Sequence, residues 1–287
     1  MTAGEALAQA QATLAAAGVD TPRLDAQLLL AWTLKGRRED LARDPQRALS
    51  PREALIFSKA VELRALRRPL PYITGEQWFY GRPFKINRAV LIPRPETELL
   101  VEATLACVAD VPSPQLADIG MGSGCIAVSL ACERPDAAVW ATDLSPDALK
   151  TARKNVSRHG VQARVSLLHG DLLAPLPLSR RFHVVVSNPP YVTEHEFSSL
   201  QPEVRDYEPG LALSGEPGAT GPDGDALHRR ILEEARAVLA PNGWALLEVG
   251  QGQAERVAGF ARALGYNRVD VLFDLAGIGR VVRAQWP

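Results

Sequence analysis

The feature that most constrains this chain is the alternation of strand-length apolar segments with helical segments from residue 115 onward. Strands are expected at residues 116–119, 138–142, 164–168, 183–187, 244–249, 269–273 and 280–284. Helices are expected between them at residues 126–132, 146–156, 226–239 and 254–264. Such alternation indicates parallel strands joined by right-handed helical crossovers. We therefore expect an α/β fold whose closing hairpin adds the last strand in the antiparallel sense.

The first 70 residues carry a different pattern. Apolar residues recur there near helical spacing, as at Leu24, Leu28 and Trp32. The run Ser50-Pro51-Arg52-Glu53 predicts a helix start, with Ser50 as the cap and Glu53 reaching back to it. Around Gly81, residues 78–86 are typical of two short strands joined by a turn. We expect a helical domain over 1–70, a β-hairpin linker over 71–95 and an α/β domain over 96–287.

A glycine-rich loop follows the first expected strand of the α/β domain. It consists of Asp118, Ile119, Gly120, Met121, Gly122, Ser123 and Gly124. In open α/β sheets this turn binds nucleotides, because glycine lets the backbone bend tightly and approach a ligand. An ordinary glycine-rich turn is the alternative. The spacing G-x-G-x-G differs from the dinucleotide pattern G-x-G-x-x-G.

Two aspartates follow the next two expected strands. Asp143 closes the second strand, where a carboxylate accepts hydrogen bonds from ribose hydroxyls. A helix cap is the competing role, and Ser145 is better placed for it. Asp171 follows the third strand and is equally consistent with accepting a bond from an adenine amino group or with a plain turn. Together with the loop, Asp143 favours a nucleoside ligand.

The sharpest motif is Asn188-Pro189-Pro190-Tyr191, directly after the apolar strand at residues 183–187. The prolines have fixed φ and no N–H donor, so carbonyl groups here are free to face a pocket. With the Asn188 side-chain carbonyl, they form acceptors for both protons of a planar NH₂ group. Tyr191 offers a ring to the substrate plane or to a sulfonium cation. The motif predicts a site that orients an amide or aromatic amine.

These residues resemble class I S-adenosylmethionine-dependent methyltransferases that act on planar nitrogen. Residues 91–98, Leu-Ile-Pro-Arg-Pro-Glu-Thr-Glu, are similar to a segment typical of peptide chain release factor glutamine methyltransferases of the HemK or PrmC type. Residues 71–76 match that family's linker, and residues 204–224 resemble its substrate-side insertion. The resemblance covers about residues 71–248. Met121 and Leu172 depart from the usual family pattern.

The resemblance implies a Rossmann-like seven-stranded sheet, S-adenosyl-L-methionine as methyl donor and S-adenosyl-L-homocysteine as product. The implied substrate is the glutamine of the Gly-Gly-Gln motif in bacterial class 1 release factors, recognised with the helical domain. Catalysis and substrate binding are assigned to Asn188, Pro189, Pro190 and Tyr191. The implied cofactor-binding residues are Asp118, Gly120, Met121, Gly122, Ser123, Gly124, Asp143, Asp171, Leu172 and Asn188.

Charge and cysteine content narrow the function classes. Net charge is −1; residues 1–75 hold 11 Lys and Arg against 8 Asp and Glu, and the remainder holds 21 against 25. This nearly neutral charge does not give the strong basic field of a nucleic-acid-binding protein. Cys107, Cys125 and Cys132 have no C-x-x-C spacing, and the five histidines are not clustered, so no metal is expected. No secretory signal or membrane segment is evident. We expect a cytoplasmic protein without membrane or direct nucleic-acid partners.

Three other functions remain open at this point. The same Asn-Pro-Pro-Tyr chemistry serves adenine in DNA or RNA, or another protein glutamine. The glycine loop with Asp143 is also consistent with a dinucleotide-binding oxidoreductase, although that reading leaves residues 188–191 without a role. A non-catalytic binding protein built around the helical domain requires Asn188 to be dispensable.

Overall fold

A computed structural model describes residues 1–177 and 179–287, which form two compact units. The first unit contains residues 1–76 and 201–207, and the second contains residues 77–200 and 208–287. The expected division of the chain was contiguous. The observed one places the hairpin with the α/β part and adds a seven-residue segment from the middle of the chain to the helical part.

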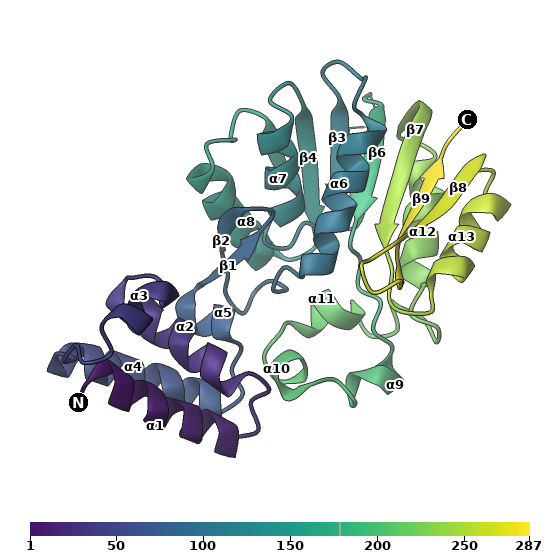
Figure 1. Ribbon diagram of the computed structural model, residues 1–287. Coiled ribbons are helices and arrows are strands. Elements are labelled where there is room, and N and C mark those ends of the chain that lie inside the picture. Colours follow the sequence, from purple (N-terminus) through teal and green to yellow (C-terminus); the bar gives the residue numbers. More distant parts are fainter. Residues whose placement is uncertain (178) are drawn as a thin grey trace. The chain divides into compact units, whose positions relative to one another are not determined.

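The first unit is a bundle of helices (Figure 1). The helices of its N-terminal part are α1 (Ala3–Ala16), α2 (Pro22–Leu34), α3 (Arg38–Arg43), α4 (Pro51–Ala65) and α5 (Leu70–Thr74). The predicted start of α4 is confirmed, because the Ser50 side chain accepts from the Glu53 N–H and Glu53 reaches back to the Ser50 N–H. Leu14, Leu29 and Leu30 are fully buried in the core between the helices.

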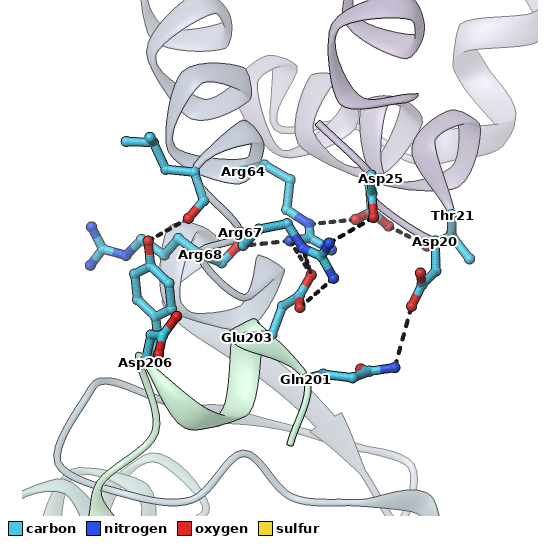
Figure 2. Close-up of polar contacts among 12 residues, drawn as sticks. Asp20, Thr21, Asp25, Arg64, Arg67, Arg68, Gln201, Glu203 and Asp206 are labelled. Atoms are coloured by element: carbon cyan, nitrogen blue, oxygen red, sulfur yellow. Dashed lines mark hydrogen bonds and ion pairs between the residues drawn. The ribbon is translucent and has the colours of Figure 1, made fainter. Parts of the chain in front are cut away.

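The added segment contains α10 (Pro202–Arg205), and ion pairs hold it within the first unit (Figure 2). The Glu203 carboxylate accepts from Arg67 Nε at 2.6 Å and from Arg64 Nη1 at 2.9 Å. Arg64 Nε also donates to Asp25 at 2.6 Å. Burial alone raises the pKa of Glu203, but the bonds from Arg67 and Arg64 outweigh it and the pKa is lowered. Tyr207 adds a hydrogen bond to the Leu66 carbonyl.

The second unit is built on a seven-stranded sheet with the strand order β5-β4-β3-β6-β7-β9-β8. The strands are β3 (Gln115–Ile119), β4 (Ala138–Asp143), β5 (Val165–His169), β6 (Phe182–Ser187), β7 (Leu239–Glu248), β8 (Arg268–Phe273) and β9 (Gly279–Gln285). Neighbours from β5 to β7 pair in parallel, and β9 runs antiparallel between β7 and β8. The α/β class and the antiparallel insertion of the last strand are confirmed.

Helices cover both faces of this sheet (Figure 1). They are α6 (Glu98–Cys107), α7 (Cys125–Glu133), α8 (Pro146–Arg158), α12 (Ala226–Ala235) and α13 (Ala254–Ala263). Side chains alternate between the faces of a strand. Ile119 of β3 belongs to the core that contains Ile231 of α12 and Val257 of α13. Asp118, one residue earlier, instead bonds to the Ala127 N–H of α7.

Short elements complete the second unit. They are the hairpin β1 (Glu76–Phe79) and β2 (Arg82–Lys85), the 3₁₀ helix η1 (Pro95–Thr97), α9 (Glu194–Phe197) and α11 (Gly210–Ser214). The helix expected over 226–239 ends at Ala235, because Leu239 already pairs with Phe182 as the start of β7. No helix in the described part of the chain combines the length and apolar character needed to cross a membrane.

Replacing Arg64 by alanine removes the buried cation that donates to both the Asp25 and the Glu203 carboxylates. Only 8% of the Arg64 side chain is exposed. We expect the free energy of opening α2 and α4 to fall by about 3–5 kcal/mol. Amide hydrogen exchange measures this loss.

The matched control is Arg43→Ala, which removes an ion pair whose Arg43 side chain is 80% exposed. Its loss is expected below about 1 kcal/mol. Equal losses in the two variants contradict the role given to Arg64.

Candidate active site

A cavity of about 410 Å³ lies in the second unit at the carboxyl ends of β3, β4, β5 and β6. This volume is in the range of small-molecule sites, and the position is where open α/β sheets bind ligands. Among the residues expected from the sequence, those that line it are Gly120, Met121, Gly122, Ser123, Asp143, Asp171, Leu172, Asn188 and Pro190. Asp118, Gly124, Pro189 and Tyr191 are not part of the lining.

The glycine loop wraps around the end of β4. The Gly120 and Met121 N–H groups both donate to the Thr142 carbonyl at 2.9 Å. Gly122 has a φ of +53°, a left-handed conformation that favours glycine, and its N–H donates to Asp143 Oδ2 at 2.8 Å. The loop therefore presents backbone and the Asp143 carboxylate to the same cavity.

Asp143 keeps acceptor capacity for a ligand. Oδ2 accepts from Gly122, and Oδ1 accepts from the Ser145 N–H at 2.8 Å. An ionised carboxylate has about four lone-pair sites, so one site on each oxygen remains. Burial raises the pKa of Asp143, and the two backbone bonds oppose that rise. These two remaining acceptor sites fit the two hydroxyl groups of a ribose.

Asp118 has a structural position. Its side chain is fully buried, and Oδ2 accepts from the Ala127 N–H at 3.0 Å near the start of α7. Burial raises the pKa of this carboxyl group to about 7. Asp118 thus joins β3 to α7 behind the glycine loop, and its assignment to the cofactor stays a prediction.

Asp171 and Leu172 lie at the end of β5. The Asp171 carboxylate accepts from Arg230 Nη2 at 2.5 Å, and Arg230 also pairs with Glu234. Arg230 lines the cavity as well, so this wall presents a salt bridge rather than a lone carboxylate. The Leu172 carbonyl accepts from the Thr142 hydroxyl at 2.8 Å, which connects the walls formed by β4 and β5.

The Asn188–Tyr191 loop is held from behind by Gln253. Its side-chain amide donates to the Tyr191 carbonyl and to the Asp223 carbonyl, each at 3.2 Å, and it accepts from the Gly250 N–H at 2.9 Å. Burial raises the pKa of the Tyr191 phenol to about 12. The roles predicted for Pro189 and Tyr191 remain predictions.

The wall before α6 contributes residues to which the sequence pattern assigned no role. Thr97 and Arg94 line the cavity, and Asn188 Nδ2 donates to Thr97 Oγ1 at 3.3 Å. The buried Glu208 accepts from Arg94 Nη2 at 2.5 Å and from the Ile92 N–H at 3.0 Å. The only sequence signal was their place inside the family-like segments. The partners come together from positions more than 90 residues apart.

The lining supports an organic ligand rather than a metal ion. Met121, Leu144, Leu172 and Leu227 give it apolar walls that suit an aromatic base. In residues 1–177 and 179–287, no group of three or more His, Cys, Asp or Glu is arranged to hold a metal ion. The residues present therefore fit a nucleoside, with apolar walls for its aromatic base and the Asp143 carboxylate for its ribose.

Comparison with known proteins finds matches for both parts of the chain. The family model described as "PrmC N-terminal domain" matches residues 5–75, and "Methyltransferase small domain" matches residues 95–203. The release factor glutamine methyltransferase of Cereibacter sphaeroides is 44% identical over 287 residues, covering 100% of this chain and 99% of that protein. The Moorella thermoacetica protein of the same name is 44% identical, covering 98% and 97%.

A solved structure extends the comparison to the fold. The crystal structure of a methyltransferase from Pyrococcus furiosus superposes with a TM-score of 0.52 and 18% sequence identity. The match covers 83% of this chain and 98% of that one. It shows that the two chains share a fold.

Gly224 tests the packing behind the Asn188–Tyr191 loop. It has a φ of +74°, and an added Cβ would overlap the Tyr191 carbonyl oxygen and lie 2.5 Å from Gln253 Nε2. Gly224→Ala should lower the free energy of unfolding by about 1–3 kcal/mol beyond the cost of its left-handed backbone. Thermal unfolding measures the loss.

Gly252→Ala is the matched control, because φ there is +84° and an added Cβ meets no atom within 4 Å. It carries the backbone cost alone, about 1–2 kcal/mol. If both variants lose the same stability, Gly224 has no special part in supporting the loop.

Proposed function

Because the chain belongs to the release factor glutamine methyltransferase family, we propose that it methylates the glutamine of the Gly-Gly-Gln motif in bacterial class 1 release factors. The methyl group goes to the side-chain amide nitrogen. S-adenosyl-L-methionine is the donor, and S-adenosyl-L-homocysteine is the product. The observation that carries the proposal is the position of Asn188, which faces the same cavity as the Asp143 carboxylate.

The chain's residues bind the donor through its nucleoside. Asp143 accepts the ribose hydroxyls through its two remaining lone-pair sites, and the glycine loop brings backbone close to the ligand. Met121 and Leu172, which line the cavity, would contact the base. When bound, S-adenosylmethionine supplies a methyl group on a sulfonium, the electrophile of the reaction.

The substrate amide is held by acceptors. The Asn188 side-chain oxygen accepts one proton of the glutamine NH₂ group, and the family resemblance assigns the other to the carbonyl of Pro189, the residue between the lining residues Asn188 and Pro190. With both protons held, the nitrogen faces the methyl group. Forming the N–CH₃ bond breaks the S–CH₃ bond, and the nitrogen releases one proton to solvent. Orientation supplies the catalysis, since well-aligned reactants gain up to roughly 7–11 kcal/mol.

The helical first unit fits recognition of a protein substrate. It carries 11 basic and 8 acidic residues through residue 75, a weak field for a polyanion. Release factors act in translation, so we place the reaction in the cytoplasm.

The choice between protein and nucleic acid is tested with S-adenosylmethionine carrying a labelled methyl group. We expect label in a class 1 release factor and none in adenine-containing DNA or RNA. A release factor with alanine in place of the motif glutamine is the control. Label in nucleic acid alone overturns the assignment.

Asn188 and Asp143 should separate catalysis from donor binding. Asn188→Ala is expected to lower kcat at least about 100-fold while S-adenosylhomocysteine still binds, because an oriented acceptor is lost. Asp143→Ala is expected to weaken S-adenosylhomocysteine binding about 100-fold, because two hydrogen bonds to a charged group are removed. Calorimetry and steady-state kinetics give both values. Full turnover by the Asn188 variant contradicts the mechanism.

A further inference from the structure

The side chains of Asn188, Thr97 and Glu248 form a polar row that leads away from the cavity. Asn188 Nδ2 donates to Thr97 Oγ1 at 3.3 Å, and the Thr97 hydroxyl lowers the pKa of the neighbouring Glu248 carboxyl group, as a donor beside a carboxylate does. Thr97 and Glu248 are each only 3% exposed. Asn188 and Thr97 line the cavity, whereas Glu248 lies behind them. Nothing in the mechanism above uses Glu248.

The sheet register explains why these residues meet. β6 and β7 are parallel neighbours, with Ser187 opposite Leu247. Asn188 follows directly after the end of β6, and Glu248 is the last residue of β7. Thr97 closes η1 directly before α6 and reaches the same edge. Three separate segments of the second unit therefore supply the side chains of this one polar row.

The hydrogen bonds along this polar row run in one direction, because its three side chains differ in the protons that they can donate. An ionised carboxylate only accepts, and a hydroxyl has one proton to give. Because the Thr97 hydroxyl lowers the pKa of Glu248, we assign that proton to Glu248, which leaves the Thr97 oxygen to accept from Asn188. Asn188 must then turn its NH₂ toward Thr97, and its carbonyl oxygen is the end left for a ligand. A reversed amide would compete with Glu248 for the single Thr97 proton.

We propose that Thr97 and Glu248 are positioning residues that fix the Asn188 amide with its oxygen toward the substrate, and so make the site selective for an NH₂ donor. The inference rests on the proposed function and deepens it. With the opposite orientation, Asn188 would present an NH₂ group to the NH₂ of glutamine. Two donors would then face each other.

The surroundings of Glu248 make its ionisation sensitive to pH. Burial raises its pKa to about 7, and one oxygen, Oε2, has no hydrogen-bond partner in the described part of the chain. The Thr97 bond and the cations Arg280 and Arg94 oppose the rise, and Glu96 adds to it. The Tyr191 phenol and the Cys125 thiol also sense its charge, and the buried His228 ring of α12 bonds to the Glu248 backbone carbonyl at 2.8 Å.

The direction of the pH effect follows from the bond directions. Above its pKa, Glu248 is ionised and accepts from Thr97, so the Asn188 amide keeps its oxygen toward the substrate. Below its pKa, the protonated carboxyl group donates to Thr97 and frees the Thr97 proton for the Asn188 oxygen. Wild-type kcat should therefore fall as pH is lowered through about 7.

Kinetics of matched variants test the role of each group. Thr97→Val removes the hydroxyl and should lower kcat about 10- to 100-fold, with Thr97→Ser recovering most of the loss. Glu248→Gln keeps an oxygen that accepts from Thr97 but does not ionise, so it should flatten the inflection near pH 7 that the Glu248 titration causes. Thr104→Val, which removes a fully buried hydroxyl of α6, is the control and should leave kcat unchanged. Wild-type kcat in Thr97→Val, or an unchanged inflection in Glu248→Gln, overturns the proposal.

A second readout does not depend on activity. With ¹⁵N-labelled asparagine, the side-chain NH₂ signal of Asn188 is assigned by its loss in Asn188→Asp. We expect this signal to shift with a midpoint near pH 7 in the wild type, and to stay constant in Glu248→Gln. A pH-independent signal in the wild type contradicts the proposal.

The two readouts separate the two hypotheses. If the wild type methylates a release factor and the variants match it, only the positioning role fails. If the wild type transfers no methyl group to a release factor, the proposed function fails. The NMR titration then still decides whether Glu248 orients Asn188.

Discussion

The structure depends on how polar groups are satisfied at the carboxyl edge of the parallel sheet. Strands end there, so backbone groups and polar side chains must find partners where a ligand also has to enter. Buried polar groups are costly unless they are hydrogen-bonded. Asp143 is held by two N–H groups and Asn188 by Thr97, and each keeps an acceptor free. The hydrogen bonds that satisfy these side chains also fix their orientation toward the cavity.

The segment that follows the Asn188–Tyr191 loop is fixed by two carboxylates. Glu203 accepts from Arg64 and Arg67 within the first unit, and Glu208 accepts from Arg94 and Ile92 within the second. Residues shortly after Glu208, such as Leu211 and Ala212, line the cavity. The wall formed by these residues therefore follows shortly after a carboxylate that is fixed within the second unit.

Much of this architecture could be predicted from local sequence patterns. The strands and helices from residue 115 onward follow from periodicity, and the start of α4 follows from Ser50 and Glu53. Local pattern did not predict α10 as part of the first unit, because that placement depends on Glu203 reaching arginines about 136 residues away. The end of α12 was misplaced because strand pairing of Leu239 overrides its helical neighbours.

In the site, too, local sequence patterns predict some residues and miss those whose partners are distant in the sequence. The cavity's glycine loop, Asp143 and Asn188 follow strand ends, where sequence reasoning is strong. Thr97, Glu248 and Gln253 act through partners that only the fold brings close, and of the three only Thr97 lies within a family-like segment. Conversely, Asp118 belongs to the motif, but its side chain bonds to α7 instead of facing the cavity.

The proposed mechanism requires a site that orients the NH₂ group of one glutamine. Peptide mass spectrometry of a class 1 release factor incubated with the enzyme and S-adenosylmethionine is the decisive measurement. We expect one added methyl group on the side-chain nitrogen of the Gly-Gly-Gln glutamine. A methyl group on any other residue, or an unmodified motif after complete incubation, would contradict it.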